Sequence, residues 1–235
     1  MNIAIILSGG QGCRMDMDIP KQYIEIDGSP IIAWCLETFV KHRAIDALII
    51  VLDPQWQTFV ASLPVLTDSG KPIWYAPSGD TRQQSIYNGL KRAKECGASD
   101  EDIVVIHDGV RPLVDEEMIC GVLDGCRDFD GAIASVAVKE NIYVACTEKR
   151  GEINDALWRR ALFTGQTPEA YRFGKYLEIH ERTSDKEIAV VTGGAEFAFR
   201  HGLKVTLTEG KDRNLKLTVP DDLEIFKILI RHEWK

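Results

Sequence analysis

Long apolar runs, excess positive charge and closely paired cysteines are all missing from the sequence. The longest apolar stretches, Ile3 to Leu7 and Ala47 to Leu52 among them, are far shorter than the roughly 18 residues of a membrane span. No basic segment precedes the first apolar run, so we expect no signal peptide. With 28 basic against 36 acidic residues and a net charge of −8, we expect no general binding to nucleic acid or to an anionic membrane.

The cysteines and histidines show no spacing typical of a metal site. None of the six cysteines belongs to a C-x-x-C pair, and the five histidines are scattered. Because no secretion signal is present, we expect reduced thiols and a cytoplasmic protein. The remaining composition, 45% hydrophobic and 27% charged over 235 residues, is that of a globular chain with a sizeable core.

Short apolar runs alternate with helix-like stretches along the chain. We expect strands at Ile3–Ser8, Ala47–Leu52, Ile73–Tyr75, Ile103–His107, Ala132–Val138 and Lys204–Leu207. We expect helices at Pro30–Lys41, Gln55–Leu63, Arg82–Cys96, Glu116–Asp128, Lys175–Arg182 and Pro220–His232. Continuous apolar strands separated by amphipathic helices predict a mostly parallel sheet covered on both faces. The predicted fold is therefore α/β, three-layered (α/β/α) and Rossmann-like, in a single domain over residues 1–235.

The segment 139–163 breaks this alternation. A loop of this length inside a compact domain is usually functional or disordered, so we favour an arm excursion over a variable surface loop. The arm cannot easily bury its own apolar side chains, which are Ile142, Tyr143, Leu157 and Trp158. An exposed set of this kind usually marks an interaction surface.

A glycine-rich loop follows the first expected strand. It reads Ser8-Gly9-Gly10-Gln11-Gly12-Cys13-Arg14-Met15, and Pro20-Lys21-Gln22-Tyr23 comes after it. Glycines let backbone N–H groups approach phosphate oxygens, and Arg14 and Lys21 add positive charge beside that backbone. Since ligands of α/β sheets bind beyond the carboxyl ends of the strands, this loop suits a triphosphate.

Other interpretations of the loop compete with this one. The dinucleotide fingerprint needs G-x-G-x-x-G, but here Gly10-Gln11-Gly12 is followed by Cys13-Arg14-Met15. The P-loop fails because no Gly-Lys-Ser/Thr sequence is present. A glycine-rich turn with exposed basic residues stays open if this loop is taken alone.

Five motifs, in the same order as in a known family, resemble nucleotidyltransferases that activate sugar and polyol phosphates. The resemblance is strongest to 2-C-methyl-D-erythritol 4-phosphate cytidylyltransferase and ribitol-5-phosphate cytidylyltransferase. The motifs are Gly9-Gly10-x-Gly12-x-Arg14-Met15 with Pro20-Lys21-Gln22, Gly79-Asp80-Thr81-Arg82-x-x-Ser85, His107-Asp108-Gly109-Val110-Arg111-Pro112, Gln166-Thr167-Pro168 with Arg159 upstream, and Asn214-Leu215-Lys216-Leu217-Thr218. The resemblance extends from residue 1 to about residue 230.

The reaction implied by this resemblance is attack by a phosphate monoester on the α-phosphorus of CTP, with release of pyrophosphate. The second pKa of a monoester is about 6, so the nucleophile is already largely dianionic and needs no catalytic base. Positioning and charge neutralisation must then supply the catalysis. By resemblance, Arg14, Lys21 and Lys216 are the catalytic cations, and Mg²⁺ bridges triphosphate oxygens. The alternative for each cation is a solvated surface charge.

The resemblance assigns nucleotide binding to two segments of small residues. The first would cradle the triphosphate with Ser8, Gly9, Gly10 and Gly12. The second would read the pyrimidine and hold the ribose with Gly79, Asp80 and Ser85. Asp80 and Thr81 are also good N-caps for the helix expected from Arg82, and the two roles are compatible.

The acceptor is assigned, also by resemblance, to Asp108, Arg111, Arg159 and Thr167. Asp108 follows an apolar strand and is a candidate for the acceptor hydroxyls or for the metal, whose ligands are otherwise unassigned. His107 beside it is interpreted as a hydrogen-bonded structural residue, because no general base is required. In the family the arm crosses to a partner subunit, which implies a homodimer in which Arg159 and Thr167 contact the acceptor phosphate of the neighbouring chain.

Two acceptor-side segments depart from the family pattern. Where the family often has Pro-Val-x-Asp-Thr, this chain reads Ala137-Val138-Lys139-Glu140-Asn141. Where the family has Thr-Asp-Glu or Thr-Asp-Asp, it reads Thr192-Gly193-Gly194. The nucleotide-side motifs are intact. Gly9-Gly10, Val110-Arg111-Pro112 and Gly165-Gln166-Thr167-Pro168 favour the ribitol-phosphate branch.

Three other functions compete with this interpretation. A molybdenum-cofactor guanylyltransferase also begins with Gly-Gly-x-x-x-Arg-Met, but the Gly79 to Ser85 segment argues against it. An NAD-dependent dehydrogenase is disfavoured by the glycine spacing. A non-catalytic nucleotide sensor is disfavoured because Arg14, Lys21 and Lys216 are all retained.

Overall fold

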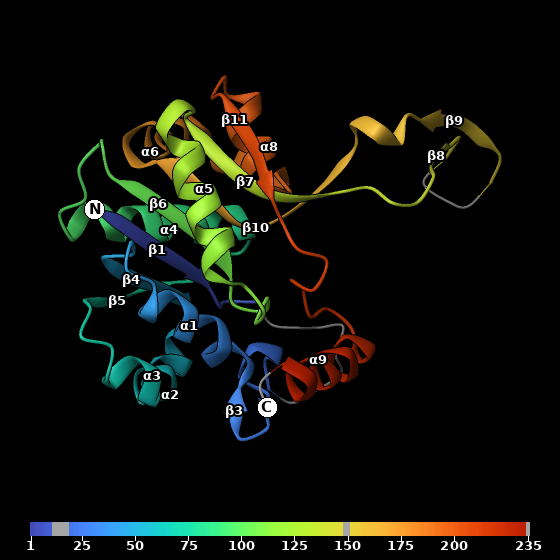
Figure 1. Ribbon diagram of the computed structural model, residues 1–235. Helices are drawn as coiled ribbons and strands as arrows, with labels where there is room; N and C mark the ends of the chain where they lie inside the picture. Colours follow the sequence, from blue (N-terminus) through green and yellow to red (C-terminus); the bar gives the residue numbers. More distant parts are fainter. Residues whose placement is uncertain (11–18, 148–150, 234–235) are drawn as a thin grey trace.

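The protein is built around a seven-stranded sheet (Figure 1), seen in a computed structural model that describes residues 1–10, 19–147 and 151–233. Its strand order is β11-β7-β10-β6-β1-β4-β5. The strands are β1 (Asn2–Leu7), β4 (Ala47–Leu52), β5 (Ile73–Pro77), β6 (Ile103–Asp108), β7 (Gly131–Ala137), β10 (Phe163–Arg172) and β11 (Val205–Glu209). Only β10 runs antiparallel to its neighbours in the sheet. The predicted α/β fold with a mostly parallel sheet is confirmed.

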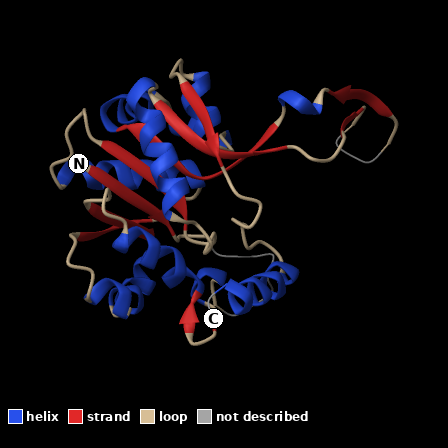
Figure 2. Cartoon of the chain, in the orientation of Figure 1, coloured by secondary structure: helices blue, strands red, loops and turns tan. Residues whose placement is uncertain are grey.

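Helices cover both faces of the sheet (Figure 2). One face packs against α1 (Ile31–Lys41), α2 (Gln57–Ala61), α3 (Pro64–Thr67) and α5 (Glu116–Asp128). The other packs against α4 (Arg82–Glu95), α6 (Phe173–Arg182), α7 (Asp185–Val190) and α8 (Gly194–Arg200). Side chains of β1 alternate between the two layers, with Ala4 and Ile6 in one core and Ile3 and Ile5 in the other. This is why the central strands are apolar without interruption.

A third apolar cluster lies outside the two main layers. It joins α9 (Pro220–Glu233) to Ile24, which directly follows η1 (Lys21–Tyr23), to Ile26 of β2 (Glu25–Ile26), and to Ile31 at the start of α1, just after β3 (Ser29–Pro30). Ile24 and Leu217 are both buried in it, at 8% and 0% exposure. Because these residues are near neighbours of Lys21 and Lys216 in the chain, the cluster fixes the backbone from which both lysines project.

The sequence prediction was wrong in omitting β10. Its apolar pattern is interrupted by Gly165, Gln166 and Pro168, and its pairing with β7 shifts register between Gly165 and Glu169. The short helices α3, α7 and α8 were also not predicted. The stretch expected as one helix from Gln55 to Leu63 is divided into η2 (Pro54–Trp56) and α2. In the described part of the chain, no helix combines the length and apolarity needed to cross a bilayer.

The segment 139–163 forms a hairpin that extends away from the sheet (Figure 1). Its strands are β8 (Ile142–Ala145) and β9 (Ile153–Leu157), which among the described residues pair with each other and with no other strand, and η3 (Arg159–Ala161) follows them. Trp158 is 71% exposed and Tyr143 is 57% exposed. Packing against the rest of its own chain therefore contributes little to the stability of the hairpin.

Candidate nucleotide-binding and catalytic site

A pocket of about 680 Å³ opens at the carboxyl ends of β1, β4, β5 and β6. Nine residues assigned from the sequence line it together, namely Ser8, Gly9, Gly10, Lys21, Gly79, Asp80, Ser85, Asp108 and Lys216. Gly12 and Arg14 lie outside the described residues. A second hollow of about 800 Å³ lies toward the other end of the sheet, around Asp100 and Arg172, and contains none of the sequence motifs.

The glycine loop is held from below by two buried side chains. Gln22 Nε2 donates to the carbonyl oxygens of Ser8 (2.7 Å) and Gly10 (2.9 Å), and Tyr23 Oη donates to the Ser8 carbonyl at 3.1 Å. A Cβ on Gly9 would lie 2.1 Å from the Cβ of Ser78, so this close approach requires glycine. A Cβ on Gly10 would meet nothing within 4 Å, so packing does not explain that glycine. Its bare backbone on the pocket wall does suit a phosphate.

Ser85 organises the second segment of small residues. Its hydroxyl accepts from the Gly79 N–H at 3.0 Å and donates to the Thr81 carbonyl at 3.0 Å. The N-cap of α4 is Thr81, whose hydroxyl accepts from the Gln84 N–H, while Asp80 is exposed at the pocket wall. The loop is therefore shaped by Ser85 and Thr81, which leaves Asp80 available to a ligand.

Asp108 is the centre of a cluster of charges. Its Oδ1 lies 3.1 Å from Arg82 Nε, and its Oδ2 lies 2.8 Å from Lys216 Nζ and 3.9 Å from Arg111 Nε. Burial by itself would raise the pKa of this carboxyl, but Arg82 and Lys216 outweigh burial and hold the pKa far below its usual range. Asp108 is thus a carboxylate at any working pH, in surroundings rich in positive charge.

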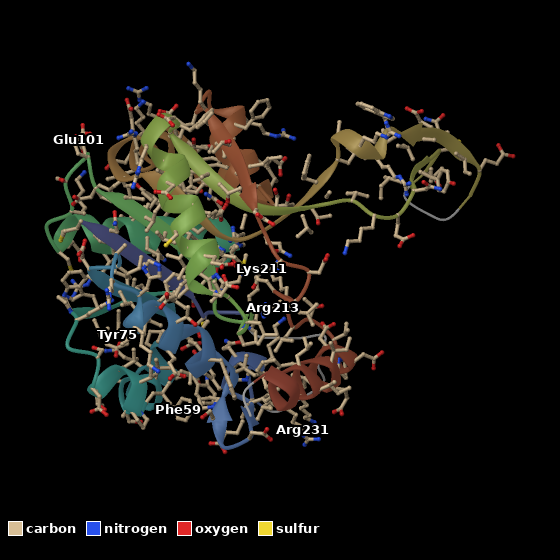
Figure 3. The ribbon with its side chains drawn as sticks, in the orientation of Figure 1. Phe59, Tyr75, Glu101, Lys211, Arg213 and Arg231 are labelled. Carbon is tan, nitrogen blue, oxygen red and sulfur yellow. The ribbon has the colours of Figure 1, made fainter. Side chains whose placement is uncertain are left out.

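The segment that carries Lys216 is tied to this cluster by several contacts. Arg111 Nη1 donates to the Asn214 carbonyl at 2.7 Å, and the Leu217 N–H donates to the Val110 carbonyl at 2.9 Å. Arg213, shown with Lys211 in Figure 3, pairs with Asp115 at 2.9 Å. These contacts hold the segment against the end of β6, so that Lys216 reaches the pocket.

Three residues assigned to the acceptor do not line this pocket. Arg111 is mostly buried and serves the contacts just described. Thr167 is 5% exposed, and its Oγ1 accepts from the Asp108 N–H at 3.1 Å. Arg159 is exposed on the arm, where its Nη1 donates to the Lys139 carbonyl at 2.8 Å. The structure therefore brings Arg111 and Thr167 beside Asp108, whereas Arg159 lies on the separate arm.

His107 fits the structural role given to it. It is fully buried, and its Nε2 lies 3.0 Å from the Arg111 carbonyl. Burial lowers the pKa of its imidazole to about 4, so the ring is neutral near pH 7. It does not line the pocket and has no direct route to a reacting group.

Sequence reasoning missed four residues that shape the site. Gln22 and Arg82 lay inside recognised motifs but received no role, and Asp53 stood at the end of β4, where a strand-end carboxylate is itself a signal. Glu169 carried no signal, because it follows Pro168 in a strand that was not predicted.

The donor set of the pocket fits a metal ion that arrives with phosphate. Among the described residues, no group of three or more His, Cys, Asp or Glu side chains could form a metal cage. Asp53, Asp80 and Asp108 supply carboxylates at separate points of the wall. Mg²⁺ is commonly held by one or two carboxylates together with substrate phosphates, so this set is compatible with it.

Comparisons with known proteins agree on one family. The family model of 2-C-methyl-D-erythritol 4-phosphate cytidylyltransferase matches residues 2–232. A ribitol-5-phosphate cytidylyltransferase of Lacticaseibacillus paracasei is 35% identical over 99% of both chains. A 2-C-methyl-D-erythritol 4-phosphate cytidylyltransferase of Geobacter metallireducens is 34% identical over 98% of this chain and 97% of its own.

Solved structures show the same similarity. A crystal structure of 4-diphosphocytidyl-2C-methyl-D-erythritol synthase superposes with a TM-score of 0.79 at 27% identity, over 97% of this chain and 98% of that one. The 2-C-methyl-D-erythritol 4-phosphate cytidylyltransferase of Francisella tularensis gives a TM-score of 0.79 at 25% identity, with the same coverage.

Proposed function

Because this chain belongs to the 2-C-methyl-D-erythritol 4-phosphate cytidylyltransferase family, we propose that it transfers CMP from CTP to a polyol phosphate and releases pyrophosphate. The observation that carries this proposal is the pocket at the strand ends, where residues from all the nucleotide-side motifs meet. The matched relatives named here are cytidylyltransferases, which favours this function over a guanylyltransferase.

The proposed mechanism relies on charge and position. The bare backbone at Gly9 and Gly10 receives the triphosphate, while Lys21 and Lys216 offset the negative charge that builds up as the acceptor phosphate approaches the α-phosphorus. Arg14, outside the described residues, is proposed as the third cation. Mg²⁺ would neutralise triphosphate oxygens and would be held chiefly by those oxygens, with one of the pocket carboxylates Asp53, Asp80 or Asp108 as its protein ligand. The acceptor phosphate attacks as its dianion, so no side chain has to remove a proton.

Selection of the base is assigned to the Gly79 to Ser85 loop. A Cβ on Gly79 would lie 2.3 Å from Gln84 Cγ, so the loop packs directly on α4. Backbone groups and the exposed Asp80 can hydrogen-bond a pyrimidine and its ribose. A purine ring is larger, and we propose that this loop excludes it by size.

The acceptor side is proposed to begin at Asp108. Its carboxylate can accept from polyol hydroxyls, and Thr167 beside it keeps an O–H that can donate to a phosphate oxygen, with Arg111 adding charge. The acceptors to test are D-ribitol 5-phosphate and 2-C-methyl-D-erythritol 4-phosphate, named for the two kinds of relative. We favour the ribitol compound on the three motifs given above.

We further propose a cytoplasmic, two-fold homodimer. The apolar residues of the arm would then be covered by a second copy, and Arg159 would reach the acceptor phosphate in the partner's pocket. The exposed apolar side chains of the arm support this arrangement.

The test is pyrophosphate release from CTP, UTP, ATP and GTP with each polyol phosphate and Mg²⁺. We expect turnover with CTP and at least one of the two acceptors, and none with unphosphorylated ribitol, which lacks the nucleophile. Removal of Mg²⁺ with a chelator should abolish turnover. Equal rates with a purine triphosphate, or no CTP turnover with either acceptor, would overturn the proposal.

A further inference from the structure

A buried carboxylate beneath the pocket has no role in the proposed mechanism. Glu169 on β10 is 1% exposed. Its Oε1 lies 2.9 Å from Arg82 Nη2, and its Oε2 accepts from Tyr171 Oη at 2.7 Å. An ionised carboxylate is rarely this deep unless it is paired, so Arg82 is the partner that makes its burial tolerable.

Arg82 therefore connects two carboxylates. Its Nη2 faces Glu169, while its Nε faces Asp108 Oδ1 at 3.1 Å. A guanidinium is a rigid plane with donors in fixed directions, so holding one edge against Glu169 fixes the direction of the other. Oδ2 of Asp108 then faces Lys216 Nζ at 2.8 Å, with Arg111 Nε farther away at 3.9 Å. Glu169 thus determines how the two oxygens of Asp108 are shared.

Gly194 provides the space for this carboxylate. A Cβ at position 194 would lie 2.5 Å from Oε1 and 2.7 Å from Oε2 of Glu169, closer than any real contact. Gly194 is buried at the first position of α8. It also belongs to Thr192-Gly193-Gly194, one of the two segments in which the sequence departs from the family pattern. The missing side chain at 194 and the carboxylate at 169 are therefore two parts of one arrangement.

We propose that Glu169 is a positioning residue for the acceptor: it holds Arg82 in the orientation that presents Asp108 to the polyol, and Gly194 makes room for it. This inference rests on the proposed cytidylyl transfer, because its main readout is the KM for the acceptor. Without the Glu169 charge, Arg82 is free to turn both edges toward Asp108. The carboxylate is then occupied by the guanidinium and less available to polyol hydroxyls.

The principal test is Glu169→Gln, which keeps the size and the hydrogen bond with Tyr171 but removes the charge. We expect the KM for the accepted polyol phosphate to rise by about tenfold or more, while the KM for CTP changes by less than about threefold. A purely structural role would instead lower the melting temperature and the active fraction, and so kcat, with both KM values unchanged. That pattern would overturn the inference.

Two further variants keep the test independent of one substitution. Gly194→Ala retains every charge but displaces the Glu169 carboxylate, so it should raise the acceptor KM in the same way. Glu196→Gln removes a carboxylate from the same helix, α8, where it pairs with Arg200 at the surface, and should change neither KM. An unchanged acceptor KM in a folded Gly194→Ala would contradict the inference.

A swap variant tests the position of the charge directly. Glu169→Ala combined with Gly194→Glu moves the carboxylate from β10 to α8, into the space that Glu169 leaves. We expect the acceptor KM of this folded double variant to lie below that of Glu169→Ala, and no recovery would count against the inference. If the wild-type chain turns over neither acceptor, the proposed function fails. If the wild-type chain does turn over an acceptor, and Glu169→Gln has an unchanged KM for that acceptor, only the positioning role of Glu169 fails.

Discussion

The nucleotide side of the proposed site and the arm over 139–163 are built in opposite ways. On the nucleotide side, buried polar residues such as Gln22 and Ser85 hold the loops through hydrogen bonds within the same chain. On the arm, Trp158 is 71% exposed, and the hairpin strands pair with no other strand of the described chain. Hydrogen bonds within one chain therefore shape the described part of the nucleotide pocket, whereas the arm presents apolar surface that its own chain does not cover.

The largest effect is expected on the nucleotide side, from Lys21→Ala. Loss of one preorganised charge at the reacting phosphate typically lowers kcat by about 10²-fold or more. Lys21 lines the pocket on η1, which is anchored by buried Gln22 and Tyr23. Steady-state kinetics at saturating CTP and Mg²⁺ would measure the change.

The matched control is Lys41→Ala, because Lys41 is an exposed lysine paired with Glu37 on α1. It should leave kcat within about twofold, since exposed pairs of this kind contribute little. Near-normal kcat in Lys21→Ala would show that Lys21 is only a surface charge and that the nucleotide side lacks the assigned chemistry.

The same contrast explains which strands and site residues could be predicted from the sequence. β1 and β4 were predicted within a residue of their ends because both faces of each strand are buried, which makes the whole run apolar. Ser85 was recognisable because its partners, Gly79 and Thr81, lie within the same short loop. Glu169 was not recognisable, since its meaning depends on Arg82, 87 residues away in the chain.

For the arm, the sequence predicted an uncovered apolar set but could not identify what covers it. The apolar residues from Ile142 to Trp158 stood out as a set that the segment could not bury. In the single chain Tyr143, Leu157 and Trp158 are exposed and Ile142 is half-buried, so the partner that would cover them follows from resemblance and not from the fold of one copy. Strand β10, by contrast, was hidden because its sequence carries Gly165, Gln166 and Pro168 and has no continuous apolar run.

A complementation experiment links the two regions of the molecule. An inactive Lys21→Ala chain is mixed with an inactive Arg159→Ala chain, and subunits are allowed to exchange. If Arg159 acts in the partner's pocket, each mixed dimer has one site with both defects and one intact site. Random exchange makes half of the dimers mixed, so activity should return to about a quarter of the wild-type value.

The control for that experiment mixes Lys21→Ala with Lys216→Ala. Both lysines line the pocket of one chain, so every site of a mixed dimer keeps one defect and no activity should return. Recovery of activity in the control but not in the Arg159 mixture would contradict the proposal that both lysines act in the pocket of one chain while Arg159 acts in the partner's pocket. Absence of recovery with Arg159, despite proven exchange, would place Arg159 with its own chain or outside the site.

The smallest effect is expected on the stability of the dilute chain, from Trp158→Ser on the arm. An exposed side chain contributes within about 0.5 kcal/mol, which is at most about 2 °C in Tm for a chain of this size. A covered arm behaves differently, because association stabilises the folded state more at higher protein concentration, with the logarithm of that concentration. The Tm of the wild-type chain should therefore rise with protein concentration, and that of Trp158→Ser should not. Ile119→Val, in the fully buried core on α5, is the comparison: it should cost about 0.5–1.5 kcal/mol at every concentration. If the wild-type chain stays monomeric and its Tm is independent of protein concentration, the proposal that a second copy covers the arm is wrong. The apolar face of the arm would then have to bind some other partner.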